Sequence, residues 1–167
     1  MAVQRSLKFL DEQRLHSRPQ DLNPAKRWVI GAAIFQNSKS EDPTLLLLKR
    51  APHETAFPNA WELPGGHVET TDETVAHSVT REVLEETSQV VSEIIGELEP
   101  MTWESKTKSN IQLNYVVTVE PGVTVKLNPD EHTEWLWAQE GQIDSLFMTE
   151  EMIKVVKNAF KFAAQSL

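Results

Sequence analysis

The sequence predicts a single α/β domain in which a mixed β-sheet is flanked by helices. Two observations support this prediction: short apolar segments recur along the chain, and two longer segments carry apolar residues at helical spacing. A chain of 167 residues has the size of one domain and can bury a sufficient core without disulfides. We assign residues 1–26 to an N-terminal extension containing one or two helical turns, and residues 27–167 to the domain itself.

The predicted strands are apolar runs bounded by turn residues. The first two, residues 28–35 and 44–48, are joined by a polar turn over 37–43 and are expected to form a hairpin. A brief strand is expected at 61–63, inside a segment rich in proline and glycine. The remaining predicted strands cover residues 90–95, 101–103, 111–119, 123–127 and 134–138.

Two segments have the periodicity of amphipathic helices. In residues 72–87, Val75, Val79 and Val83 recur at i, i+4 and i+8, and Asp72 is expected to cap the helix. The second helix follows Thr149 as its N-cap. Its apolar face is formed by Met152, Val155, Val156, Ala159, Phe160 and Ala163.

Composition excludes several classes of function. The formal net charge of −9 disfavours binding to a nucleic acid polymer, which depends largely on a basic surface. The chain has no cysteine, so disulfides, thiolate ligands and a cysteine nucleophile are excluded, and a reducing compartment, the cytoplasm, is expected. No apolar run approaches the roughly 20 residues of a membrane span, so no membrane association is expected.

The helix predicted over 72–87 concentrates negative charge. At about 100° per residue, Glu82, Glu85 and Glu86 share one arc beside the valine stripe. Two unit charges about 5 Å apart repel by roughly 3 kcal/mol at an effective dielectric constant of about 20, and the helix dipole disfavours anions in the last turn. A divalent cation would relieve this repulsion, because Mg²⁺ prefers oxygen ligands. A solvated acidic face is the alternative interpretation.

The same region resembles the Nudix box. Gly65 and Gly66 are followed by Glu73. Seven residues then separate Glu73 from Arg-Glu (81–82), which is followed by Glu-Glu (85–86). Two departures are visible: six residues rather than five separate Gly66 from Glu73, and Ser88 replaces the closing glycine. Using Asp72 as the acid of the box would restore the first spacing but break the second, so Glu73 is preferred. The resemblance covers about residues 27–165 and implies the Nudix α/β/α sandwich.

The resemblance also implies roles for individual residues. The metal ligands would be Glu82, Glu85, Glu86 and the Gly65 carbonyl, holding Mg²⁺ or Mn²⁺. Arg81 would orient the acids by bonding to Glu73 or Glu85, or form only an i,i+4 pair. The general base would be Glu82, Glu131 or Glu134. Lys49 and Arg50 are expected to hold the outer phosphate of the substrate, or to be solvated strand ends.

The function implied by this resemblance is metal-dependent hydrolysis of a phosphoanhydride bond in a small molecule, such as a nucleoside diphosphate linked to another moiety. Two alternatives stay open: hydrolysis of a non-nucleotide diphosphate, such as a prenyl diphosphate, and a non-catalytic ligand-binding domain. A prenyl-diphosphate isomerase is excluded, because that enzyme needs a cysteine. Homodimers are common in the family, but no residue here indicates one.

Overall fold

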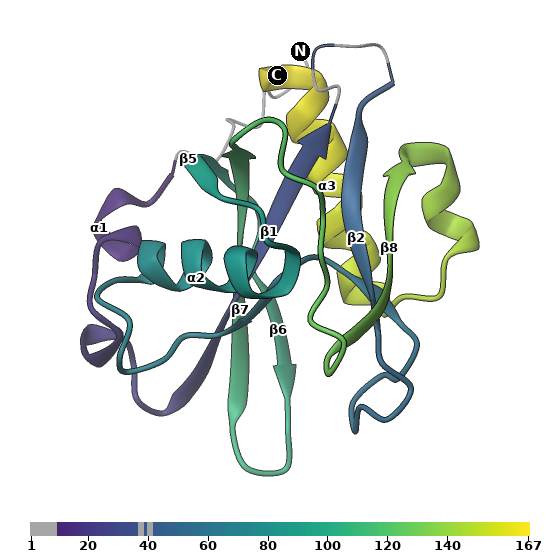
Figure 1. Cartoon of the computed structure of the whole chain (residues 1–167). Coiled ribbons are helices and arrows are strands. Elements are labelled where there is room, and N and C mark those ends of the chain that lie inside the picture. The colour runs from purple at the N-terminus through teal and green to yellow at the C-terminus, as the bar shows by residue number, and fades with distance from the viewer. Residues whose placement is uncertain (1–9, 37–38, 40–41) are drawn as a thin grey trace, which may run out of the picture.

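The computed structural model of the chain describes residues 10–36, 39 and 42–167, which form a mixed β-sheet between helices (Figure 1). The strands are β1 (Lys26–Gln36), β2 (Thr44–Arg50), β3 (Trp61–Glu62), β4 (Gly65–His67), β5 (Val91–Glu97), β6 (Met101–Glu104), β7 (Ser109–Val119) and β8 (His132–Gln139). The helices are α1 (Glu12–Leu15), α2 (Val75–Thr87) and α3 (Glu150–Ser166), with 3₁₀ turns at Pro19–Asp21 and Glu140–Ser145. Much of the predicted turn over 37–43 lies outside the described residues.

Strand β1 is the centre of the sheet. It pairs in parallel with β7 from Lys26 to Ile34, and antiparallel with β4. Strand β2 pairs instead with β3 and β8. The predicted hairpin is therefore confirmed only next to its turn, where β1 and β2 pair at Phe35 and Gln36. The long parallel pairing is possible because the connection between β1 and β7 includes α2, which is long enough to cross over.

The sheet is buried on both faces. Along β2, Leu45 and Leu47 pack in the cluster that contains α3, whereas Leu46 and Leu48 pack in the cluster that contains the α2 valines. Figure 1 shows α2 and α3 on opposite sides of the sheet. Because both faces are covered, β2 is continuously apolar rather than alternating. The predicted α/β/α sandwich is confirmed.

Helix α2 begins later than expected. Its N-cap is Thr74, whose Oγ1 accepts a hydrogen bond from the His77 amide at 3.2 Å. The prediction that Asp72 is the N-cap is wrong, because the Asp72 carboxylate is occupied by other donors. The three valines of the predicted stripe are fully buried. For α3, both the Thr149 cap and the apolar face are confirmed.

The N-terminal segment packs beside α2. Leu10, Leu15 and Leu22 contribute to the core on that side of the sheet. The Ser17 carbonyl accepts a hydrogen bond from the Val75 amide at 3.1 Å, which satisfies one of the free N–H groups at the start of α2. The predicted short helical turns are present as α1 and the 3₁₀ turn that follows it. The boundary at residue 26 stays a prediction.

The strand predicted at 123–127 is wrong. In this segment only Val125 is buried, in the core on the α2 side. The Lys126 amide donates to the Thr87 carbonyl at the end of α2, and the Val123 carbonyl accepts from the Gln89 side chain. These backbone groups are thus satisfied by the end of a helix and by a side chain rather than by a neighbouring strand. The apolar residues of this segment attach it to the core without forming a β-strand.

Ser88 ends α2 in the left-handed conformation, with φ 61° and ψ 11°. The closing glycine of the box is therefore replaced without a shift of the helix end, and the Ser88 amide still donates to Leu84. A side chain in this conformation costs about 1 kcal/mol, which glycine avoids. We expect Ser88→Gly to raise the free energy of unfolding by about that amount in urea denaturation. Ser88→Ala, which keeps a Cβ, should give no gain, and an equal gain from both variants would contradict this explanation.

No helix in the described part of the chain is both long and apolar enough to cross a bilayer.

Candidate active site

The acidic arc of α2 is divided by burial. Glu82 and Glu86 lie beside the valine stripe and are buried, with exposures of 7% and 3%, while Glu85 is exposed. Burial raises the pKa of Glu82, although a hydrogen bond from Arg81 partly opposes this. A carboxylate at either buried position is thus destabilised in the absence of a cation.

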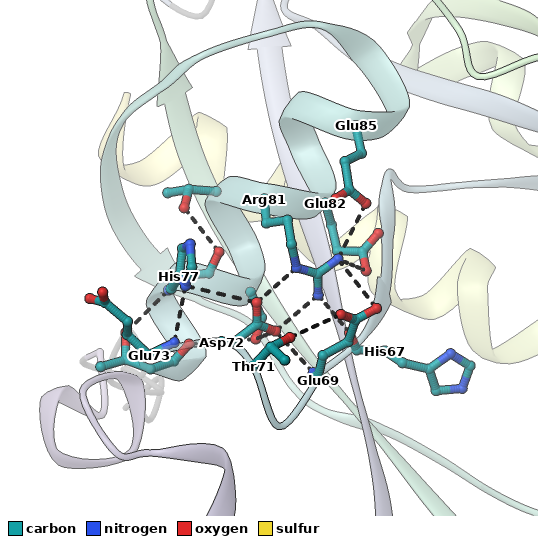
Figure 2. Close-up of polar contacts among 12 residues, drawn as sticks. His67, Glu69, Thr71, Asp72, Glu73, His77, Arg81, Glu82 and Glu85 are labelled. Carbon is teal, nitrogen blue, oxygen red and sulfur yellow. Dashed lines mark hydrogen bonds and ion pairs between the residues drawn. The ribbon is translucent and has the colours of Figure 1, made fainter.

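Arg81 is the centre of a polar network between α2 and the preceding loop (Figure 2). Its Nε and Nη2 donate to the two carboxylate oxygens of Asp72, at 2.7 and 2.9 Å. Its Nη1 donates to Glu82 at 2.8 Å and to Glu85 at 3.3 Å. Its Nη2 also donates to the carbonyl of His67 at 3.0 Å. The guanidinium therefore links the loop to two of the three glutamates on the arc.

Asp72, and not Glu73, is the acid paired with Arg81, so the preference for Glu73 is wrong. The Asp72 carboxylate also accepts from the Ser78 hydroxyl at 2.6 Å and from the Glu69 amide at 2.9 Å. Burial alone would raise the pKa of Asp72, but the hydrogen bonds from Arg81 and Ser78 outweigh it and hold the pKa well below its usual value. The backbone amide of Glu73 contacts His77 instead, and its side chain points away from Arg81 in Figure 2.

This assignment predicts different effects for two neighbouring substitutions. Asp72→Asn is expected to lower the free energy of unfolding by about 2 to 4 kcal/mol, because it leaves the partly buried guanidinium without its charged partner. The matched control Glu73→Gln should change it by less than about 0.5 kcal/mol. Urea denaturation of both variants tests the assignment, and the reverse order of effects would restore Glu73 as the partner.

Glu86 lies against β4, the short strand that carries the two glycines. Its Oε2 accepts a hydrogen bond from the Gly65 amide at 2.8 Å. Burial raises the pKa of Glu86 well above its usual value, and the nearby Glu62, Glu131 and Glu82 add to this rise despite the Gly65 hydrogen bond. Several carboxylates thus converge on one buried position.

The glycines are needed because the backbone passes close to both β1 and α2. A Cβ on Gly65 would lie 2.0 Å from the Ile30 carbonyl oxygen, and one on Gly66 would lie 2.6 Å from the carboxyl atoms of Glu82. Any side chain here would collide with the neighbouring strand or with an acid of the arc. The glycine pair therefore lets the backbone of β4 approach the carboxylates.

The start of β8 supplies the opposite wall of the site. One oxygen each of Glu86 and Glu131 and one ring nitrogen of His132 lie within 4.8 Å of one another. The structure thus brings the predicted Glu131 to the box, whereas Glu134 is exposed and bonds to the Lys49 ammonium at 2.7 Å. His132 was not among the predicted site residues, because it has no sequence spacing typical of a metal site.

Lys49 and Arg50 are both engaged within the protein. Besides its bond to Glu134, the Lys49 ammonium lies 5.9 Å from the ring centroid of Trp61. The Arg50 guanidinium donates to Glu62 at 3.0 Å, to Glu54 at 3.2 Å and to the Ala56 carbonyl at 2.8 Å. Arg50 therefore holds acids and a loop in place, and any contact with a phosphate requires it to exchange partners.

The residues present fit a divalent cation. The buried carboxyl groups of Glu82 and Glu86 on α2, whose pKa values burial raises, lie beside the exposed Glu131 at the start of β8. Among the described residues, the buried Nδ1 atom of His132 has no hydrogen-bond partner. An orphaned buried polar atom beside like charges is typical of a site that binds an ion. The carboxylate oxygens and this nitrogen are donors that Mg²⁺ or Mn²⁺ accepts.

A groove of about 400 Å³ adjoins the box loop. His67, the residue after the glycine pair, forms part of its wall. The groove is also lined by Lys26, Arg27 and Lys108, and none of its lining residues within the described part of the chain is Asp or Glu. In a chain with a net charge of −9, this lining is a local region of positive charge.

The protein is an α/β/α sandwich in which a glycine pair packs against buried carboxylates of one helix. Comparisons with known proteins identify the family that shares this architecture. A model of the NUDIX domain matches residues 25–159. The chain belongs to the Nudix family.

Two curated proteins illustrate the similarity. The m7GpppN-mRNA hydrolase NUDT17 of Danio rerio is 38% identical over 106 residues, which are 59% of this chain and 32% of that protein. The Nudix hydrolase NudL of Enterobacter sp. (strain 638) is 33% identical over 118 residues, which are 70% of this chain and 54% of that protein. The chain thus spans about a third and about half of the lengths of these relatives.

Solved structures share the fold. The MutT protein of Methanosarcina mazei Go1 is 26% identical with a TM-score of 0.61, covering 86% of this chain and 96% of that one. The Ap4A hydrolase of C. elegans is 22% identical with a TM-score of 0.66, covering 83% and 98%. The NUDIX domain of Shewanella oneidensis NrtR, complexed with ADP ribose, is 18% identical with a TM-score of 0.67, covering 92% and 98%.

Proposed function

We propose that this protein hydrolyses a phosphoanhydride bond in a nucleoside diphosphate linked to another moiety, with Mg²⁺ or Mn²⁺. The observation that carries this proposal is the convergence of the buried Glu82 and Glu86 with the exposed Glu131, which costs stability unless a cation is bound. The relative from Danio rerio is named as a hydrolase of m7GpppN-mRNA, and a structural neighbour as an Ap4A hydrolase; in both names the substrate is a nucleotide linked through phosphates.

We assign the metal to Glu82, Glu85, Glu86 and the Gly65 carbonyl, with Glu131 adjacent. When bound, the cation neutralises negative charge on the phosphate oxygens and makes a water more acidic. Arg81 positions the ligands, since it bonds to both Glu82 and Glu85. The glycine pair keeps the backbone close enough for the carbonyl to take part.

The proposed general base is Glu131 or Glu82. Water attacks one phosphorus of the anhydride while the carboxylate accepts the proton, the bridging P–O bond breaks, and two phosphorylated products leave. Glu131 is the better choice, because Glu82 already accepts from Arg81, whereas Glu131 is exposed and close to Glu86. Glu134 is a weaker candidate, because Lys49 holds its carboxylate.

We further propose that the basic groove beside His67 receives an anionic part of the substrate. Lys26, Arg27 and Lys108 lie there without an acid in the lining, whereas Arg50 and Lys49 are already paired. Positive charge next to the box would attract and orient a molecule that carries phosphate groups. The predicted contact of Lys49 and Arg50 with the outer phosphate is retained as a second possibility, with exchange of their acidic partners.

The experiment that tests the proposal is a hydrolysis screen with and without Mg²⁺ or Mn²⁺, in which products are identified by mass. Substrates should include dinucleoside polyphosphates, nucleotide sugars, capped nucleotides, coenzyme A and prenyl diphosphates. We expect metal-dependent cleavage of a nucleotide-linked diphosphate. Cleavage of only prenyl diphosphates would favour the non-nucleotide alternative, and binding without any cleavage would favour a ligand-binding domain. The cytoplasmic location and a homodimer stay predictions.

A further inference from the structure

His132 is a buried histidine with one ring nitrogen engaged and the other free. Its exposure is 3%, and its Nε2 lies 2.9 Å from Oε1 of Glu62. Its Nδ1 is shielded from solvent and has no hydrogen-bond partner among the residues that the structure describes. Few buried polar atoms in proteins lack a partner, and each exception calls for a physical cause such as a water or an ion.

The Glu62 contact fixes which nitrogen carries the proton. Oε1 of Glu62 also accepts from the Arg50 guanidinium at 3.0 Å, so this oxygen serves as a hydrogen-bond acceptor on the side that faces His132 as well. Nε2 of His132 is therefore the donor. In a neutral imidazole, Nδ1 then presents a lone pair and cannot donate.

This arrangement is the one that prepares a histidine for a metal. Histidines that bind metals usually donate their other ring N–H to a carboxylate, which fixes the tautomer and makes the free nitrogen more basic. Arg50, Glu62 and His132 form such a chain from β2 and β3 to the start of β8. A ring nitrogen of His132 also lies within 4.8 Å of carboxylate oxygens of Glu86 and Glu131.

We infer that Nδ1 of His132 is a nitrogen ligand of the divalent cation, beside the proposed oxygen ligand Glu86 and the proposed general base Glu131. This inference rests on the metal-dependent function proposed above and adds to it a ligand that the glutamates of the box do not supply. Arg50 and Glu62 become positioning residues for that ligand.

A nitrogen ligand changes which metal the site prefers. Imidazole suits transition metals such as Fe, Ni, Cu and Zn best, and Mn²⁺ accepts it more readily than Mg²⁺, which prefers an all-oxygen set. His132→Gln is therefore expected to weaken Mn²⁺ binding about tenfold or more, and Mg²⁺ binding to a smaller extent. Isothermal titration of the full chain with each metal alone measures this difference.

The decisive measurement is the electron spin echo modulation of Mn²⁺ bound to the full chain. In the wild type we expect modulation from a directly bound ¹⁴N nucleus, replaced by that of ¹⁵N when the protein is labelled with ¹⁵N-histidine. His132→Gln should remove the nitrogen signal. His53→Gln is the matched control and should retain it, because that exposed ring bonds to the Asp130 carbonyl instead.

The outcomes separate this inference from the proposed function. Tight Mn²⁺ binding without a histidine nitrogen signal in the wild type would overturn the ligand assignment and leave the proposed function intact. No Mn²⁺ binding at all would overturn both. If His132→Gln does not fold, the isotope experiment on the wild type still tests for a histidine ligand. A signal that persists in His53→Gln then points to His132, the histidine that lies with Glu86 and Glu131 in the described part of the chain.

Discussion

Glu86→Gln is expected to abolish turnover while making the metal-free protein more stable. The amide keeps the shape of the side chain and can still accept the hydrogen bond from Gly65, so the fold should be retained. It removes the negative charge that burial and neighbouring acids disfavour. We expect the hydrolysis rate to fall by about three orders of magnitude, and the Tm of the metal-free protein to rise.

The stability difference should depend on pH in a defined direction. A free glutamate titrates near pH 4.3, whereas the pKa of Glu86 in the folded protein is raised. Between these two pKa values the unfolded chain has lost a proton that the folded protein keeps, so stability falls as pH rises through this window. Above the folded-state pKa the loss is complete. Metal-free wild type should therefore lose stability from about pH 4.3 upwards, and Glu86→Gln should lose less.

Two further measurements complete this test. Glu85→Gln is the matched control: it is exposed and on the same arc, so its metal-free Tm should stay near that of the wild type. Mn²⁺ should raise the Tm of the wild type but not that of Glu86→Gln. A Glu86→Gln variant with wild-type turnover, or with an unchanged response to Mn²⁺, would remove this residue from the site.

Gly65→Ala is expected to destabilise the protein by about 3 kcal/mol or more. The new Cβ would lie 2.0 Å from the Ile30 carbonyl oxygen and 2.9 Å from the Gly31 Cα, which are backbone atoms of the neighbouring strand β1. The steric clash can be relieved only if β4 moves away from β1. This would also displace the Gly65 amide from Glu86. Urea denaturation should show a lower midpoint, together with loss of activity.

Gly66→Ala is the matched control for this prediction. Its Cβ would meet only the carboxyl group of Glu82, the end of a flexible side chain that can move. We expect a smaller loss of stability and a weaker affinity for Mn²⁺, because the displaced carboxylate is a proposed ligand. Equal unfolding midpoints for Gly65→Ala and the wild type would show that β4 does not approach β1 this closely.

Periodicity predicted most of the architecture correctly. The valine stripe of α2 and the apolar face of α3 are both buried as expected, and the strand predictions agree with the structure except at 123–127. Strand β4 was not predicted, because its glycine pair has no apolar pattern. The successes share a cause: a residue pattern with the period of a helix or a strand indicates which face is buried. The exception arose because the apolar residues around the buried Val125 have the pattern of a short strand. The backbone amide of the next residue, Lys126, instead bonds to the end of α2.

The candidate site was predicted less completely. Helical geometry predicted that Glu82 and Glu86 share an arc with the valines, and the structure buries both. Spacing could not decide whether Asp72 or Glu73 is the acid that pairs with Arg81, because the loop before α2 has no regular residue pattern. The hydrogen bonds of Arg81 show that it is Asp72. Glu131 and Glu134 were both candidates for the general base, and the position of β8 beside β2 brings Glu131 close to Glu86.

By itself, the sequence determined the family, the two helices, and the set of acids that crowd one arc, because these follow from local periodicity and from a continuous motif. Tertiary structure alone decided that Arg50, Glu62 and His132 form a chain ending beside Glu86. These residues come from strands far apart in sequence, and only the pairing of β2 with both β3 and β8 brings them together. Contacts between distant segments leave no period in a sequence, so no pattern could have predicted them.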